Sequence, residues 1–106
     1  MILYRSVRLN RDYFNLWDIA RLELQRENYQ KAYEQFSQSY QIYLKIGRLE
    51  GICFVGLDLG TLLCRANQAA EGLPILQRSQ EGFLKLGQLQ MAQQAAELIV
   101  HFSGKA

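Results

Sequence analysis

A repeat of 40 residues restricts the possible folds of this chain more than any other feature. When the sequence is shifted by 40 positions, residues 12–49 align with residues 52–89 without a gap, and eight of the 38 pairs are identical. The identical pairs are Phe14 with Phe54, Asp18 with Asp58, Leu22 with Leu62, Ser39 with Ser79, Leu44 with Leu84, Lys45 with Lys85, Gly47 with Gly87 and Leu49 with Leu89. A period of this length is typical of chains that stack similar supersecondary units.

The apolar residues within each repeat recur three and four positions apart, as they do on one face of an α-helix. Gly47 and Gly87 follow such stretches, so each is expected to end a helix in the left-handed conformation. Pro74 is expected close to the first turn of its helix, where the missing N–H is not needed. Helices are predicted near residues 12–26, 29–46, 49–66, 70–86 and 89–102, with a further helix that ends near residue 8. The chain is therefore expected to be all-α.

The repeat also divides the chain. We expect a single domain, residues 1–106, with full repeats at 12–47 and 52–87 and a half repeat at each end. Half repeats would leave apolar edges, notably along Ile2, Leu3, Leu98, Ile99 and Phe102. Such edges predict self-association into a dimer or coverage by neighbouring repeats of a larger signalling or regulatory protein.

Composition excludes several classes of protein. The net charge is +2 and the basic residues are spread along the chain, which argues against a nucleic-acid role. No run of eighteen apolar residues is present, so no membrane span is expected. Cys53 and Cys64 lie eleven residues apart, roughly 16 Å along a helix axis, too far apart to form a disulfide with each other. Both are expected to be small buried apolar residues of a reduced, cytoplasmic protein.

Small and large residues alternate at positions that resemble the tetratricopeptide repeat. The motif has a small residue late in its first helix, where Ala20 and Gly60 stand, and another early in its second helix, where Ala32 and Gly72 stand. A large apolar residue and then a small one follow. These positions hold Phe36 and Leu76, then Ser39 and Ser79. The resemblance implies a right-handed α-solenoid of antiparallel helix pairs, and a protein-binding function.

Two departures from this motif are informative. The period is 40 residues, whereas the common tetratricopeptide repeat has 34, so the chain resembles the branch of the family with longer repeats. Members that bind chaperone tails hold a C-terminal carboxylate with lysine and asparagine. Trp17, Arg21 and Thr61 stand at those positions here, so binding of chaperone tails is not predicted.

The family's geometry implies where a partner would bind, because the first helices of successive repeats line its concave groove. The residues expected to face this groove are Phe14, Trp17, Arg21, Leu24, Gln25, Phe54, Leu57, Thr61, Cys64, Arg65, Gln94, Glu97 and His101. Aromatic side chains and guanidinium groups suit peptide recognition. No cofactor or metal is expected.

Each of these residues also has a purely structural interpretation. Trp17 is as well explained by the core, and the recurrence of Phe14 and Phe54 is as well explained by packing between repeats. A lone histidine, His101, without a Cys or His at metal spacing does not predict a ligand or a catalytic group. The leading hypothesis is a protein-interaction module and the alternative is a piece used for assembly. An enzyme is not expected, because no nucleophile lies beside a helix-spaced base.

Overall fold

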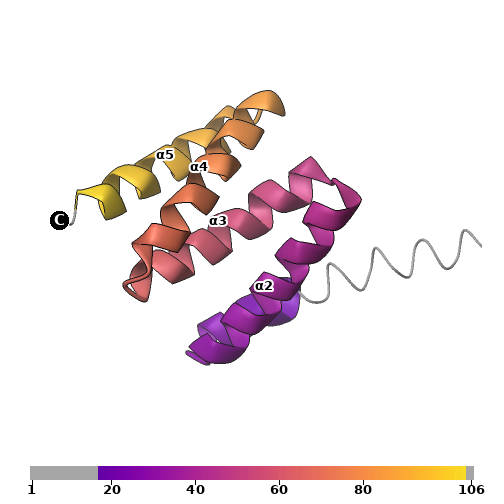
Figure 1. Cartoon of the computed structure of the whole chain (residues 1–106), viewed down its shortest axis with the longest axis vertical. Helices are drawn as coiled ribbons and strands as arrows, with labels where there is room; N and C mark the ends of the chain where they lie inside the picture. Colours follow the sequence, from indigo (N-terminus) through magenta and orange to yellow (C-terminus); the bar gives the residue numbers. More distant parts are fainter. Residues whose placement is uncertain (1–16, 105–106) are drawn as a thin grey trace, which may run out of the picture.

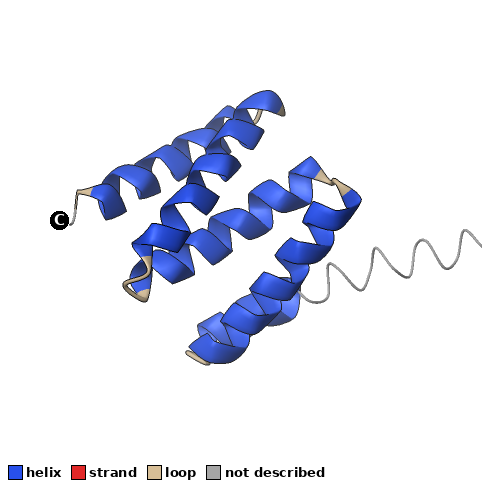
Figure 2. Cartoon of the chain, viewed as in Figure 1, coloured by secondary structure: helices blue, strands red, loops and turns tan. Residues whose placement is uncertain are grey.

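The computed structural model describes residues 17–104, and these residues form helices joined by short turns (Figures 1 and 2). The first helix is described over residues 17–25 and is called helix 17–25 below. It is followed by α2 (Tyr29–Ile46), α3 (Leu49–Arg65), α4 (Ala69–Lys85) and α5 (Leu89–Ser103). Consecutive helices among these four pack against each other, and α3 also contacts α5. No strand occurs within residues 17–104, so the predicted all-α class is confirmed.

The predicted helix boundaries agree with the structure to within one residue for α2, α3, α4 and α5. The elements also recur with the period of the sequence, because α4 begins 40 residues after α2 and α5 begins 40 residues after α3. The helix predicted to end near residue 8, together with Phe14, Ile2 and Leu3, lies outside the described residues.

One turn geometry recurs at the C-terminal ends of the four helices that precede another helix, at residues 27, 47, 67 and 87, and thus every 20 residues. Glu27, Gly47, Asn67 and Gly87 each have a positive φ, between 63° and 73°. At each end the next residue donates its N–H to a carbonyl five positions earlier, as Arg48 does to Tyr43. This pair of features defines the Schellman motif, which satisfies carbonyl groups at the helix end. The left-handed ends predicted at the two glycines are confirmed.

Glu27 is the residue least suited to this geometry, so its replacement by glycine should stabilise the protein. A left-handed conformation costs a residue with a Cβ about 1–2 kcal/mol, whereas glycine costs roughly 0.5–1 kcal/mol of chain entropy. We expect E27G to raise the free energy of unfolding by about 0.5–1 kcal/mol in urea denaturation. The matched control is G47A, which should lower it by about 1 kcal/mol, since a Cβ there meets nothing within 4 Å and only the backbone is strained. An unchanged E27G midpoint would contradict this account of the turn.

The core lies between consecutive helices and depends on glycines at their crossing points. A Cβ on Gly60 would come within 2.8 Å of the Leu76 side chain, and one on Gly72 within 2.7 Å of the Gly60 carbonyl oxygen. Close approach of α3 and α4 therefore requires glycine at both positions. Fully buried Leu76 packs against Gly60, and Phe36, one repeat earlier on α2, is fully buried in the core cluster between α2 and α3. The predicted roles of the small and large repeat positions agree with this packing.

The two cysteines belong to the same set of contacts. Both are buried and unpaired. The Sγ of Cys64 lies 2.7 Å from where a Cβ on Gly72 would be, and the Sγ of Cys53 occupies the space that a Cβ on Gly82 would need. Each sulfur thus fills a notch left by a glycine of α4, as expected for cysteine used as a small apolar residue.

The sequence predicted Pro74 close to the first turn of its helix. In the structure, Pro74 lies beyond that turn. Since α4 begins at Ala69, Pro74 is the sixth residue of the helix and cannot donate to the carbonyl of Ala70. Ala70 is exposed, so water can hydrate the carbonyl that this proline leaves free.

The C-terminal edge is less apolar than predicted. Phe102 is buried against Cys64 and Leu76, and Leu98 and Ile99 pack partly against the same cluster. The exposed apolar residues of α5 are instead Leu89 and Val100. Helix periodicity explains the difference, because residues 98, 99 and 102 share the face that packs on the preceding elements. Within residues 17–104, no helix is long and apolar enough to cross a membrane.

Candidate functional site

A groove of about 990 Å³ lies where helix 17–25, α3 and α5 face one another. Helix 17–25 provides one wall, α3 the floor and α5 the other wall. Tyr29, the first residue of α2, and Ala66, directly after α3, complete the lining. The lining residues are Trp17, Arg21, Leu24, Tyr29, Phe54, Leu57, Asp58, Thr61, Leu62, Arg65, Ala66, Met91, Gln94, Glu97 and Leu98. A concavity of this size with mixed apolar and polar lining is large enough to accept a ligand.

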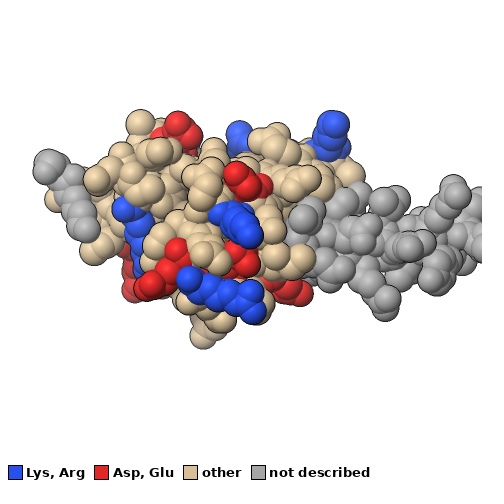
Figure 3. Space-filling view, turned by 90° about the horizontal axis from the view of Figure 1, so that it is seen from below, with Lys and Arg blue, Asp and Glu red and all other residues tan. Residues whose placement is uncertain are grey.

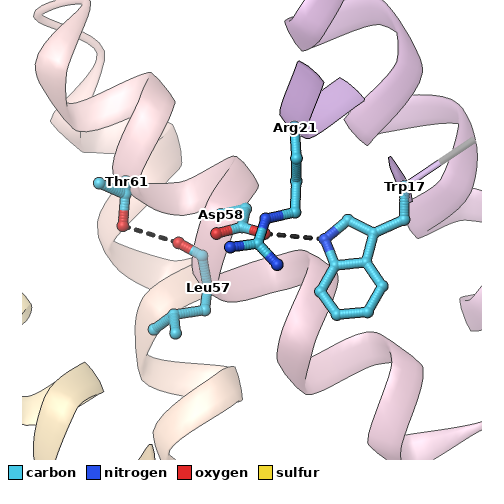
Figure 4. Close-up of polar contacts among 5 residues, drawn as sticks. All are labelled: Trp17, Arg21, Leu57, Asp58 and Thr61. Atoms are coloured by element: carbon cyan, nitrogen blue, oxygen red, sulfur yellow. Dashed lines mark hydrogen bonds and ion pairs between the residues drawn. The ribbon is translucent and has the colours of Figure 1, made fainter. Parts of the chain in front are cut away.

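Asp58 is the polar centre of the groove (Figure 4). The indole N–H of Trp17 donates to Oδ2 of Asp58 at 2.8 Å. The Nε atom of Arg21 lies 3.9 Å from the same oxygen, and its guanidinium carbon lies 5.7 Å from the centre of the Trp17 ring. Trp17 and Arg21 stand one turn apart on helix 17–25, so both can reach one carboxylate on α3. These contacts fix the position of helix 17–25 on α3.

Burial and hydrogen bonding act on Asp58 in opposite directions. Desolvation by burial raises the pKa of its carboxyl group above the ordinary value of 3.8, and the hydrogen bond from Trp17 and the charge of Arg21 partly offset the increase. The Asp58 side chain is 27% exposed and that of Arg21 is 60% exposed. Arg21 therefore approaches Asp58 through a long ion pair, while most of its side chain is exposed to solvent.

Aromatic rings connect the groove to the core. The rings of Trp17 and Phe54 are 6.0 Å apart, and Phe54 meets the edge of Phe83 at 5.0 Å with an interplanar angle of 79°. Phe83 is fully buried on α4. Trp17 itself is half-buried, lines the groove and packs against a core cluster, so it contributes to both.

The opposite end of the groove carries charges without partners. Arg65, the last residue of α3, makes no ion pair or hydrogen bond among residues 17–104, and neither does Glu97 on α5. Both side chains are exposed. The hydroxyl of Thr61, between Asp58 and Arg65 on α3, donates to the carbonyl of Leu57 at 2.7 Å. Within the described part of the chain, the guanidinium of Arg65 is therefore unoccupied.

Most of the residues expected to face the groove from the sequence are brought together there. Those that line it are Trp17, Arg21, Leu24, Phe54, Leu57, Thr61, Arg65, Gln94 and Glu97. Cys64 is buried in the α3–α4 contact instead. Gln25 is the exposed last residue of its helix, and the His101 ring packs against that of Phe102 at 4.9 Å; neither lines the groove. Phe14 lies outside the described residues.

Sequence reasoning missed six lining residues, namely Tyr29, Asp58, Leu62, Ala66, Met91 and Leu98. A signal for Asp58 was present, because aspartate recurs at Asp18 in the repeat. That signal could not show that Trp17 and Arg21 would share its carboxylate, since this contact joins residues 41 positions apart.

Charge elsewhere on the molecule is mixed. On the face drawn in Figure 3, Lys and Arg side chains are interspersed with Asp and Glu, without a large patch of one sign. Among residues 17–104, no three His, Cys, Asp or Glu side chains come together in a way that could hold a metal ion. Comparison of the chain with protein-family models, with curated proteins and with solved structures gives no match.

Proposed function

We propose that this chain is a protein-interaction module, a tetratricopeptide-like solenoid that holds a segment of a partner protein in the groove between helix 17–25, α3 and α5, without catalysis. The observation that carries the proposal is the groove itself, where an aromatic and aliphatic floor is bordered by arginine side chains. Its support from the sequence is the 40-residue repeat, because stacked repeats present extended binding surfaces. A cytoplasmic location is part of the same proposal.

The lining chemistry supports a peptide more than a small metabolite. Half-buried Phe54 and Leu57 can cover an apolar side chain of a partner, and Gln94 can exchange hydrogen bonds with its backbone. The single tryptophan of the chain, Trp17, lines this groove, so its fluorescence reports directly on occupation of the site.

The test uses peptides selected from a displayed library with the 106-residue chain and titrated while Trp17 emission is followed. We expect L57A to weaken the selected peptides about tenfold, since a buried leucine contributes about 1.5–3 kcal/mol. The matched control is L84A, an exposed leucine of α4 outside the groove, which should bind like the wild type. The proposal fails if no peptide is enriched, or if the enriched peptides leave Trp17 emission unchanged and bind L57A equally well.

A second candidate function, self-assembly, is favoured by one comparison between the repeats. Ile19 and Leu22 on helix 17–25 are 44% and 48% exposed, whereas Leu59 and Leu62, one repeat later, are 4% and 8% exposed beneath α2. An apolar face covered in one repeat and open in the other can pair with a second copy or with another helix. Analytical ultracentrifugation decides this point, because a stable monomer at micromolar concentration would exclude the dimer.

A further inference from the structure

The two arginines of the groove differ in the ion pairs that they make with other described residues. Nε of Arg21 lies 3.9 Å from Asp58 Oδ2, a long ion pair, and 60% of the Arg21 side chain is exposed. Arg65 has no partner among residues 17–104. A guanidinium presents its donors in a fork that matches a carboxylate. Both groups can therefore accept a carboxylate from outside the chain.

The acidic residues of the groove do not compete equally for these cations. The carboxylate of Asp58 is occupied by Trp17 and Arg21. Glu97 stands on the α5 wall and is not within ion-pair distance of Arg65, which stands on α3. Glu97 would therefore repel an acidic ligand from the opposite wall without neutralising the cation that attracts it.

The spacing of the cations sets the spacing of the ligand groups. Asp58, which Arg21 approaches, precedes Arg65 by seven residues on α3, or about 10 Å along the helix axis. Leu57 and Thr61 lie in the groove floor along the same stretch. In an extended peptide, alternate side chains share one face, so residues i and i+4 lie about 13 Å apart on that face with residue i+2 between them. Long arginine side chains can reach over the small difference.

From this arrangement, and resting on the proposed function, we infer that the groove selects an extended partner segment with two acidic side chains about 10–13 Å apart on one face and an apolar side chain between them on the same face. The carboxylates bind Arg21 and Arg65, and the apolar side chain rests on Leu57 and Phe54. A nucleic acid is the poorer fit, because Asp58 and Glu97 line the same groove and would meet its backbone.

The test uses three end-blocked synthetic peptides that differ at two positions only, four residues apart with a leucine midway between them. Both positions hold glutamate, glutamine or lysine. Titration with the 106-residue chain, followed by Trp17 emission, should show the glutamate peptide binding at least about tenfold more tightly than the glutamine peptide, because hydrogen bonds to charged groups are stronger than those between neutral groups. This advantage should decrease as salt is added. The lysine peptide should bind most weakly.

Two variants assign the effect to the groove. R65Q should remove most of the advantage of the glutamate peptide while binding the glutamine peptide unchanged, and E97Q should strengthen binding of the glutamate peptide. Both residues are exposed and have no partner within residues 17–104, so denaturation midpoints should stay at the wild-type value and separate these effects from unfolding.

The remaining outcomes separate this inference from the proposed function. Equal binding of the glutamate and glutamine peptides, or tighter binding of the lysine peptide, overturns the acidic preference while the groove remains a peptide site. Tighter binding of a single-stranded oligonucleotide than of the glutamate peptide, lost in R65Q, also overturns it. If neither these peptides nor any library-selected peptide alters Trp17 emission, both proposals fail.

Discussion

Replacing Phe83 by alanine should lower the free energy of unfolding by about 3–5 kcal/mol. Phe83 is fully buried and packs with Cys53 and Ala92 between α3, α4 and α5. It also meets the Phe54 ring edge-on at 5.0 Å, an arrangement that contributes about 0.5–1.5 kcal/mol beyond the area it buries. Truncation removes these contacts and leaves a cavity. The cavity could close only if all three helices moved. A loss of this size is a large fraction of the stability of a small domain.

Urea denaturation followed by far-ultraviolet circular dichroism measures the change. The matched control is L84A, because Leu84 is the next residue of the same helix and is 53% exposed. Its truncation should change the unfolding free energy by less than about 1 kcal/mol. Similar losses in F83A and L84A would show that Phe83 does not hold the helices together. In folded F83A, Phe54 loses its support, so weaker peptide binding in the groove is also expected.

The sequence predicted the helices well because three signals, two of them local, agree with one another. Apolar spacing marks the helical faces, Gly47 and Gly87 end two helices, and the 40-residue period carries each assignment from one repeat to the next. Asn67 and Glu27 show the limit of this reasoning. Both adopt the same left-handed turn as the glycines, but only asparagine has some intrinsic preference for it, and glutamate gives no local signal.

The candidate site was predictable to the extent that it follows helix periodicity. Trp17, Phe54 and Glu97 line the groove as expected, because each lies on the predicted face of its helix. The polar contacts across the groove could not be predicted. Asp58 and Asp18 are identical repeat positions, yet Asp18 is exposed while Asp58 is held by Trp17, because the neighbouring helix decides what each meets.

Adding a methyl group at Gly82 should destabilise the protein, and removing the facing sulfur should restore much of the loss. A Cβ on Gly82 would occupy the space of Cys53 Sγ, which is a side-chain atom that can be deleted. Alanine is favoured over glycine in a helix by about 1 kcal/mol, so a net loss of about 1–3 kcal/mol in G82A would be steric. C53A alone leaves a small cavity. The double variant adds a methyl group at residue 82 and removes the sulfur atom at residue 53 from the same space. We therefore expect a favourable coupling energy of about 1–2 kcal/mol in the double-mutant cycle.

The matched cycle at Gly72 and Cys64 should give a different result. A Cβ on Gly72 would lie 2.7 Å from Cys64 Sγ, but also 2.7 Å from the carbonyl oxygen of Gly60 and 3.0 Å from the backbone nitrogen of Cys64. Deleting the sulfur leaves both backbone atoms in place, so C64A should not rescue G72A. Rescue in both cycles would mean that α3 and α4 can separate at little cost, whereas rescue in neither would mean that Cys53 does not fill the notch at Gly82. Rescue at Gly82 alone is the result expected of two helices held at fixed distance by their backbones.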